Sequence, residues 1–185
     1  EDARLTFPER IVETRKLNGL NVEREMREIV TSEIAKLGVF AQISLSQAMM
    51  SSPQALATQL ANMAAKGSVA ESVAVAAKRL ADTQPVTAKL EGLLKLVREL
   101  RAKRPADWRL VVFTLRKETQ DAIGRALTSE GVAIDFIRGG AGHANQSTVE
   151  RFRTSPPKIN VIVSTDAGAE GVNLQAGNVV VNYDL

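Results

Sequence analysis

A stretch near the C-terminus carries the residues best suited to chemistry, VIVSTDAGAEGVNLQ (residues 161–175). The apolar strand predicted there ends at Ser164 and Thr165, so their hydroxyls lie at its carboxyl end, where parallel sheets bind ligands. Gly168 and Gly171 allow a tight turn and a close approach of the backbone to another molecule. Free N–H groups in such a loop can hold phosphate oxygens. The alternative is a capped turn between a strand and a helix, which many α/β domains contain.

The second part of the chain must position this loop, and it alternates strands with helices from Trp108 onward. Continuous apolar strands separated by helices are typical of a parallel sheet that is covered on both faces. We therefore predict an α/β fold with a mostly parallel sheet and flanking helices. The strands are expected at 110–114, 132–137, 160–164 and 178–182, and the helices at 117–130 and 145–153.

The first part of the chain, residues 1–104, is predicted to be mainly helical, and the α/β core is predicted to occupy residues 105–185. Residues 5–17 contain a proline and suggest a short extended segment. Ser51-Ser52-Pro53 is a strong helix start, because a hydroxyl caps the first turn and proline is tolerated in it. Apolar spacing predicts helices at 22–37, 53–65, 68–81 and 87–104, and Gly38 is a suitable stop for the first.

Composition excludes several kinds of site. The 185 residues contain no cysteine, which excludes disulfides, thiolate zinc sites and a cysteine nucleophile. They contain a single histidine, His143, which excludes a multi-histidine metal site.

We expect an intracellular protein, cytoplasmic or nucleoid-associated if the source is bacterial. No apolar run is long enough to cross a bilayer, so no membrane partner is expected. The net charge of +3 favours an anionic partner only weakly. Both ends suggest a piece of a longer chain.

Three segments together resemble known motifs. STDAGAEGVNLQAGNVVVNYDL, from Ser164, resembles motif V and the following strand of superfamily-two helicases, especially the Swi/Snf-like and bacterial RapA-like ATPases. VVFTLRKETQDAIGRAL, from Val111, is similar to motif IV, and DFIRGGAGHANQSTVERFR, from Asp135, resembles the next block. The resemblance implies the second, C-terminal RecA-like lobe of such an ATPase, preceded by a helical segment. It also implies that the chain stops before motif VI.

Residue roles follow from the resemblance where the motifs match. It implies that hydroxyls and backbone amides lie along a nucleic-acid backbone, which suits contacts that do not read sequence. The implied residues are Thr114, Gly139, Ser164 and Thr165, with Arg116 and Arg138 as nearby cations. Glu170, Gly171 and Asn173 are placed near the ribose and phosphates of ATP. From residue types alone, the Asn173 amide would hydrogen-bond to the backbone of its own loop, and Arg116 would be a solvated residue at a helix start.

The resemblance also implies partners. We expect two partners: nucleic acid, with DNA favoured over RNA, and a missing N-terminal RecA-like lobe. We also expect ATP as the cofactor, with its Mg²⁺ ion held mainly by the missing lobe. The chain has no GxxxxGK[ST] phosphate loop, and no catalytic residue or metal ligand is assigned in it. ATP hydrolysis needs groups that hold the phosphates and metal and neutralise developing charge, so this chain alone is predicted to be inactive.

Two other functions remain open from the sequence. A non-enzymatic RecA-like module could dock a protein partner on the Ala-rich helices between Pro53 and Ala81. A flavodoxin-like domain could use RGGAG and TDAGAEG as phosphate loops. His143 is predicted to face solvent or cap a helix, and Trp108 and Tyr183 are predicted to pack in the core.

Overall fold

The computed structural model describes residues 11–165, 168 and 170–184. Part of the extended lead-in predicted at 5–17 therefore lies outside the described residues. The first helices are α1 (Asn21–Ile34), α2 (Val39–Ser51), α3 (Pro53–Ala65), α4 (Glu71–Thr83) and α5 (Ala88–Lys103). They are followed by β1 (Leu110–Thr114), α6 (Lys117–Ser129), β2 (Ile134–Ile137), α7 (Gly142–Arg153), β3 (Val161–Thr165) and β4 (Val179–Asn182).

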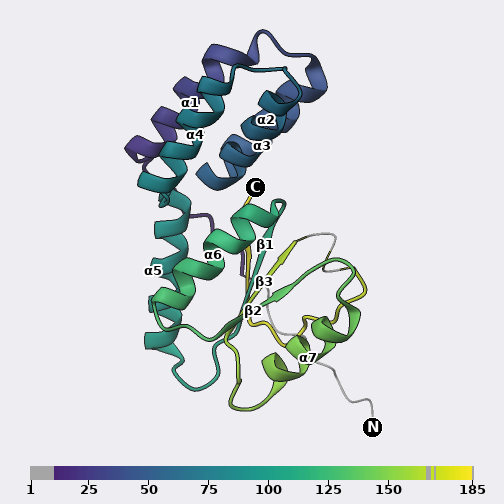
Figure 1. Ribbon diagram of the computed structural model, residues 1–185. Coiled ribbons are helices and arrows are strands. Elements are labelled where there is room, and N and C mark those ends of the chain that lie inside the picture. Colours follow the sequence, from purple (N-terminus) through teal and green to yellow (C-terminus); the bar gives the residue numbers. More distant parts are fainter. Residues whose placement is uncertain (1–10, 166–167, 169, 185) are drawn as a thin grey trace.

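The strands form one parallel sheet in the order β2-β3-β1-β4. Helices α5 and α6 cover one face and α7 covers the other (Figure 1). This arrangement confirms the predicted α/β class. A crossover between parallel strands needs a long connection, and α6 and α7 lie in the connections from β1 to β2 and from β2 to β3.

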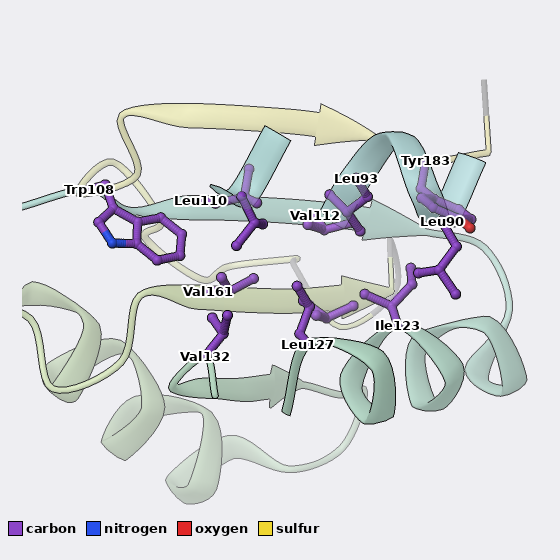
Figure 2. Close-up of a cluster of buried hydrophobic side chains, with 12 residues drawn as sticks. Leu90, Leu93, Trp108, Leu110, Val112, Ile123, Leu127, Val132, Val161 and Tyr183 are labelled. Atoms are coloured by element: carbon purple, nitrogen blue, oxygen red, sulfur yellow. The ribbon is translucent and has the colours of Figure 1, made fainter. Parts of the chain in front are cut away.

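The core follows the alternation of side chains along each strand. Leu110 and Val112 of β1 point towards Ile123 and Leu127 of α6 (Figure 2). Val111, between them, joins Phe152 of α7 on the other face. Figure 2 also shows Trp108 and Tyr183 at opposite ends of the first cluster, and both are buried, which confirms their predicted packing role.

Helices α1 to α4 form a separate helical unit with its own core. Its central residues include Met26 of α1, Leu45 of α2, Leu60 of α3 and Leu80 of α4. Helix α3 starts as predicted, since Pro53 is its first residue and the Ser52 hydroxyl accepts a hydrogen bond from the Ala55 N–H at 3.1 Å. Figure 1 shows this helical unit at one end of the sheet, at the top of the view.

Helix α5 runs from the helical unit along the sheet (Figure 1). Its apolar face contributes Leu90, Leu93 and Val97 to the core of the sheet. Residues 88–103 thus belong to the sheet by packing, although the sequence groups them with the helices before them.

Helix α2 is the main element that the sequence prediction missed. Its buried residues Leu45 and Ala48 alternate with exposed apolar side chains, among them Phe40 and Ile43, so its apolar residues show no helical period. Gly38, predicted as a stop, is the residue immediately before this helix. Two predicted helix starts were also three residues off, because α4 begins at 71 rather than 68 and α7 at 142 rather than 145.

Candidate functional site

The carboxyl ends of the strands meet along one edge of the sheet, which we call the carboxyl edge. Thr114 of β1 pairs with Thr165 of β3, and Ile137 of β2 pairs with Ser164. Parallel register therefore brings Thr114, Ser164 and Thr165 together, and Arg138 directly follows β2. These residues are far apart in sequence, and their convergence is what the predicted site requires.

The β1–β4 side of this edge is occupied by contacts within the chain. Thr114 is 1% exposed, and its hydroxyl donates to Asp184 Oδ2 at 2.6 Å. The Leu115 N–H donates to the same oxygen at 2.6 Å. Lys89 Nζ lies 3.5 Å from Asp184 Oδ1. A phosphate could bind the Thr114 hydroxyl only by replacing the Asp184 carboxylate.

Arg116 is also held within the chain. It precedes the first residue of α6, as predicted, but its guanidinium reaches the helical unit instead of being simply solvated. Nη2 donates to the Ser44 carbonyl at 2.9 Å, and Nη1 donates to Gln59 Oε1 at 3.3 Å. Arg116 therefore links the sheet to α2 and α3.

Hydroxyls and a lysine complete this junction. Thr119 Oγ1 lies 2.7 Å from both Ser51 Oγ and Ser52 Oγ. Lys89 Nζ donates to the Met50 carbonyl at 2.5 Å and to the Tyr183 carbonyl at 3.0 Å. The helical unit thus covers the β1–β4 half of the carboxyl edge, which we call the covered half.

Burial changes the titration of two groups in the covered half. It lowers the pKa of Lys89, although the nearby Asp184 carboxylate opposes that change. It also raises the pKa of Tyr183 to about 12, against the smaller opposing effect of a hydrogen bond with Thr87.

The other half, at the ends of β2 and β3, is accessible, and we call it the open half. The Arg138 side chain is 42% exposed, Gly139 is exposed and Thr165 is half-buried. Arg138 Nη2 donates to Asp121 Oδ1 at 2.5 Å, and its guanidinium lies 4.6 Å from the centre of the Phe136 ring. A cation that is fixed and yet exposed is suited to binding an oxyanion.

Two amide side chains that the sequence analysis did not select also hold Arg138. Its Nε donates to Gln120 Oε1 at 3.1 Å. Its backbone N–H donates to Asn145 Oδ1 at 3.2 Å, and Asn145 Nδ2 donates back to the Arg138 carbonyl at 2.8 Å. The sequence carries a signal for Gln120, because a glutamine occupies the face of α6 on which Ile123 and Leu127 are apolar.

Gly168, which follows β3 in the chain, lies close to the end of β2. Ser164 is buried, and its hydroxyl donates to the Thr165 carbonyl at 2.9 Å. A Cβ on Gly168 would stand 2.8 Å from the Ile137 carbonyl oxygen. At Gly168 the close approach is therefore made towards the chain's own backbone. An approach to another molecule stays a prediction for Gly171, where a Cβ would meet nothing within 4 Å. Asp166 lies outside the described residues.

The residues predicted to face a nucleotide follow on an exposed loop. Gly171 has a φ of +74°, a conformation that favours glycine, and so it makes the predicted tight turn. Glu170 and Asn173 are exposed. Asn173 Oδ1 accepts a hydrogen bond from the Gln175 N–H at 3.0 Å, which is the loop-satisfying role that its residue type predicts. His143 is exposed in the first turn of α7, as predicted.

Within the described part of the chain, no group of three or more His, Asp or Glu side chains is arranged to hold a metal ion. None of the described helices combines the length and apolar character that a membrane crossing would require.

A parallel sheet with helices on both faces and polar groups along its carboxyl edge defines the class of α/β lobes to which RecA-like domains belong. The sequence profile described as "Helicase conserved C-terminal domain" matches residues 88–185, more than half of the chain. The chain therefore belongs to the helicase conserved C-terminal domain family, which confirms the predicted second lobe of superfamily-two helicases.

Curated relatives agree with this assignment. The pre-mRNA-processing ATP-dependent RNA helicase prp11 of Schizosaccharomyces pombe is 30% identical over 113 residues, or 60% of this chain and 11% of the relative. The ATP-dependent RNA helicase DBP5 of Mycosarcoma maydis is 33% identical over 76 residues, or 40% of this chain and 16% of the relative. The match thus spans only a small part of each relative's length.

Solved structures share the fold. The helicase domain of Pyrococcus furiosus Hef aligns with a TM-score of 0.57 at 16% identity, covering 89% of this chain and 46% of that one. The C-terminal part of the Fun30 ATPase domain aligns with a TM-score of 0.53 at 14% identity, covering 88% of this chain and 70% of that one. The predicted RecA-like architecture is confirmed.

Proposed function

We propose that this chain is the second motor lobe of a nucleic-acid-dependent ATPase and that the open half of its carboxyl edge grips the nucleic-acid backbone. The observation that carries the proposal is the convergence of Arg138, Gly139 and Thr165 at the ends of adjacent parallel strands. An exposed guanidinium, a glycine backbone and a hydroxyl are groups that bind phosphates without reading bases.

The covered half would support this grip from behind. Thr114 and Arg116 hold the strand ends and the helical unit in place through Asp184 and Ser44. Ser164 is buried beside Thr165 and would shape the backbone of the grip rather than offer its hydroxyl. A phosphate would bind Thr114 or Arg116 directly only after their hydrogen bonds to Asp184 and Ser44 break.

The nucleotide would bind on the loop after β3. The Glu170 carboxylate could accept ribose hydroxyls, and the exposed backbone at Gly171 and the Asn173 amide could approach the phosphates. Most ligands of the accompanying Mg²⁺ would come from a first RecA-like lobe. ATP bound between the two lobes would close them, and closure would move the grip along the strand.

DNA and RNA share the phosphate backbone that these groups would bind. The relatives named above are RNA helicases, and the sequence resemblance to Swi/Snf-like ATPases favours DNA. Either a helicase or a translocase could use such a lobe. Parallel titrations with single- and double-stranded DNA and RNA of equal length would decide the preferred track.

The grip is tested by measuring binding of the 185-residue chain to oligonucleotides over a range of salt concentrations. Arg138→Met is expected to weaken binding and to reduce the steepness of the log–log salt dependence by about 0.9, the value for one phosphate contact on duplex DNA. Arg79→Met removes the same charge from an exposed position on α4 and serves as the matched control. Equal effects of the two variants would contradict a grip at the open half.

The nucleotide site is tested in a protein that contains both lobes. Asn173→Ala is expected to reduce nucleic-acid-stimulated ATP hydrolysis while leaving nucleic-acid binding without nucleotide unchanged. The 185-residue chain alone is expected to hydrolyse no ATP, with or without nucleic acid. A stimulated rate from this chain alone would contradict the division of labour between lobes.

A further inference from the structure

Gln120 is a polar side chain on the apolar face of a helix. Gln120, Ile123 and Leu127 line the side of α6 that packs on the sheet, and each is 0% exposed. A buried amide is costly unless its donors and its acceptor all find partners. The position would suit a leucine if packing were its only task, so the partners of Gln120 are informative.

The amide partners lie at the ends of two neighbouring strands. Gln120 Nε2 donates to the Ile137 carbonyl of β2 at 3.0 Å and to the Val163 carbonyl of β3 at 2.9 Å. Oε1 accepts from Arg138 Nε at 3.1 Å. Carbonyls can only accept and a guanidinium can only donate, so the partners themselves fix which amide atom is nitrogen. Both amide hydrogens and the amide oxygen are used.

The same connections determine where the Arg138 guanidinium points. Gln120 holds Nε, and the next residue, Asp121, holds Nη2 at 2.5 Å. Asn145 fixes the Arg138 backbone on both sides. A long arginine side chain ordinarily loses much rotamer freedom when it binds an anion, and these contacts remove that freedom in advance.

We propose that Gln120 is a positioning residue for nucleic-acid binding. It sets the spacing between the ends of β2 and β3 and aims the Arg138 guanidinium, so that Arg138 and Thr165 meet a phosphate backbone already in place. This role rests on the proposed function of the open half. Gln120 itself, fully buried, touches no ligand and acts through Arg138.

A matched pair of variants separates positioning from simple core stability. Gln120→Leu replaces the amide with an apolar side chain of similar size and removes its hydrogen bonds. Thr119→Val, at the preceding position, removes an equally buried hydroxyl whose partners are Ser51 and Ser52 in the helical unit. Both variants lose buried hydrogen bonds on the same helix, and only Gln120→Leu detaches Arg138.

In oligonucleotide titrations of the full chain, Gln120→Leu is expected to bind several-fold more weakly, with a salt dependence shifted towards that of Arg138→Met. Thr119→Val is expected to bind like the unchanged chain. In an Arg138→Met background, adding Gln120→Leu should produce a clearly smaller loss than it does in the unchanged chain, because only the placement of Thr165 remains to be disturbed. An additive loss in the double variant, or an equal loss with Thr119→Val, would overturn the positioning role.

Arg138→Lys provides a variant that does not alter the buried amide. Lysine keeps the positive charge but lacks the planar fork that Gln120 and Asp121 hold at two points. Binding is expected to fall several-fold with little change in the steepness of the salt dependence. Affinity equal to that of the unchanged chain would show that only charge matters and would overturn the proposal.

A readout without nucleic acid distinguishes failure here from failure of the proposed function. The Arg138 Nε–H signal in nitrogen–proton NMR spectra should exchange slowly with solvent in the unchanged chain and in Thr119→Val, and rapidly in Gln120→Leu. If Gln120→Leu loses this protection but neither the unchanged chain nor any variant binds nucleic acid, the proposed function is refuted, while the role of Gln120 in holding Arg138 still stands. Retained protection in Gln120→Leu would overturn that hold, whether or not the chain binds nucleic acid.

Discussion

The covered and open halves of the carboxyl edge are built from similar residues and differ in what those residues already touch. Thr114 and Arg116 in the covered half are bonded to Asp184 and Ser44, under the helical unit. Arg138 in the open half is bonded as firmly, to Gln120 and Asp121, and yet its side chain remains 42% exposed. The place of a residue in a sequence motif therefore does not decide whether its side chain can contact a ligand. That depends on whether a neighbouring element covers the side chain.

The largest expected difference concerns the buried ion pair of the covered half. Asp184→Ala would leave Lys89 half-buried without its carboxylate, and Thr114 Oγ1 and the Leu115 N–H without their acceptor. We expect a loss of about 3 kcal/mol in the free energy of unfolding, at the lower end for a broken buried pair because Lys89 is partly solvated. Urea denaturation measures it. If the free energy of unfolding fell no further than it does when an exposed ion pair is broken, the covered half would not differ from the open half in burial of its contacts.

The covered half should also respond to alkaline pH. Burial raises the pKa of Tyr183 to about 12 from 10.0, so folding favours the neutral phenol. Its contribution is complete below pH 10 and is lost as the pH rises towards 12, by about 1.4 kcal/mol per pH unit within that window. Tyr183 is the only tyrosine, so ultraviolet absorbance follows its ionisation directly.

Tyr183→Phe is the control for this pH effect, since it keeps the ring over which Lys89 Nζ lies. The lowered pKa of Lys89 acts in the opposite sense, because stability rises as the pH approaches 10.5 from below. The difference between the two proteins isolates the tyrosine. Identical stability curves above pH 10 would mean that Tyr183 is accessible to water.

A smaller effect is expected at the joint between the helical unit and α6. Thr119→Val leaves the Ser51 and Ser52 hydroxyls without their shared partner and should cost about 1 kcal/mol. Hydrogen exchange should increase in α2 and α3 and remain unchanged in β2 and β3. Faster exchange at the open half as well would show that the two halves are not independent.

The smallest effect on stability is expected in the open half. Asp121→Asn removes an ion pair whose two side chains are each more than a third exposed, so the free energy of unfolding should change by about 0.5 kcal/mol. Nucleic-acid binding should change more than stability does, because the Arg138 guanidinium loses one of the two side chains, Gln120 and Asp121, that hydrogen-bond to it. Calorimetric melting and oligonucleotide titration of the same sample compare the two quantities.

Much of the sheet could be predicted from the sequence because its strands are short apolar runs that alternate with helices. β1 was placed at its observed bounds, and α3 began at its predicted proline. Helix α2 could not be placed, because its exposed apolar face hides the helical period. The convergence at the carboxyl edge could also be predicted, since parallel register makes it a consequence of topology.

The sequence could not reveal how the edge divides into two halves. Nothing in Thr114 or Arg116 indicates that Asp184 and Ser44 would be their partners, because these contacts join segments about 70 residues apart. The residue type of Gly168 predicts a close approach of the backbone but cannot name what it approaches, which is the end of β2. Long-range packing, rather than local pattern, determines which groups stay accessible.

The central claim is that nucleic acid lies on the open half of the carboxyl edge. The chain has no cysteine, so one introduced cysteine carries a photo-crosslinker at a single site. We predict that a label at exposed Gly139 crosslinks efficiently to bound oligonucleotide and that a label at exposed Ser72, on α4 of the helical unit, does not. Efficient crosslinking from Ser72 with none from Gly139 would contradict the account.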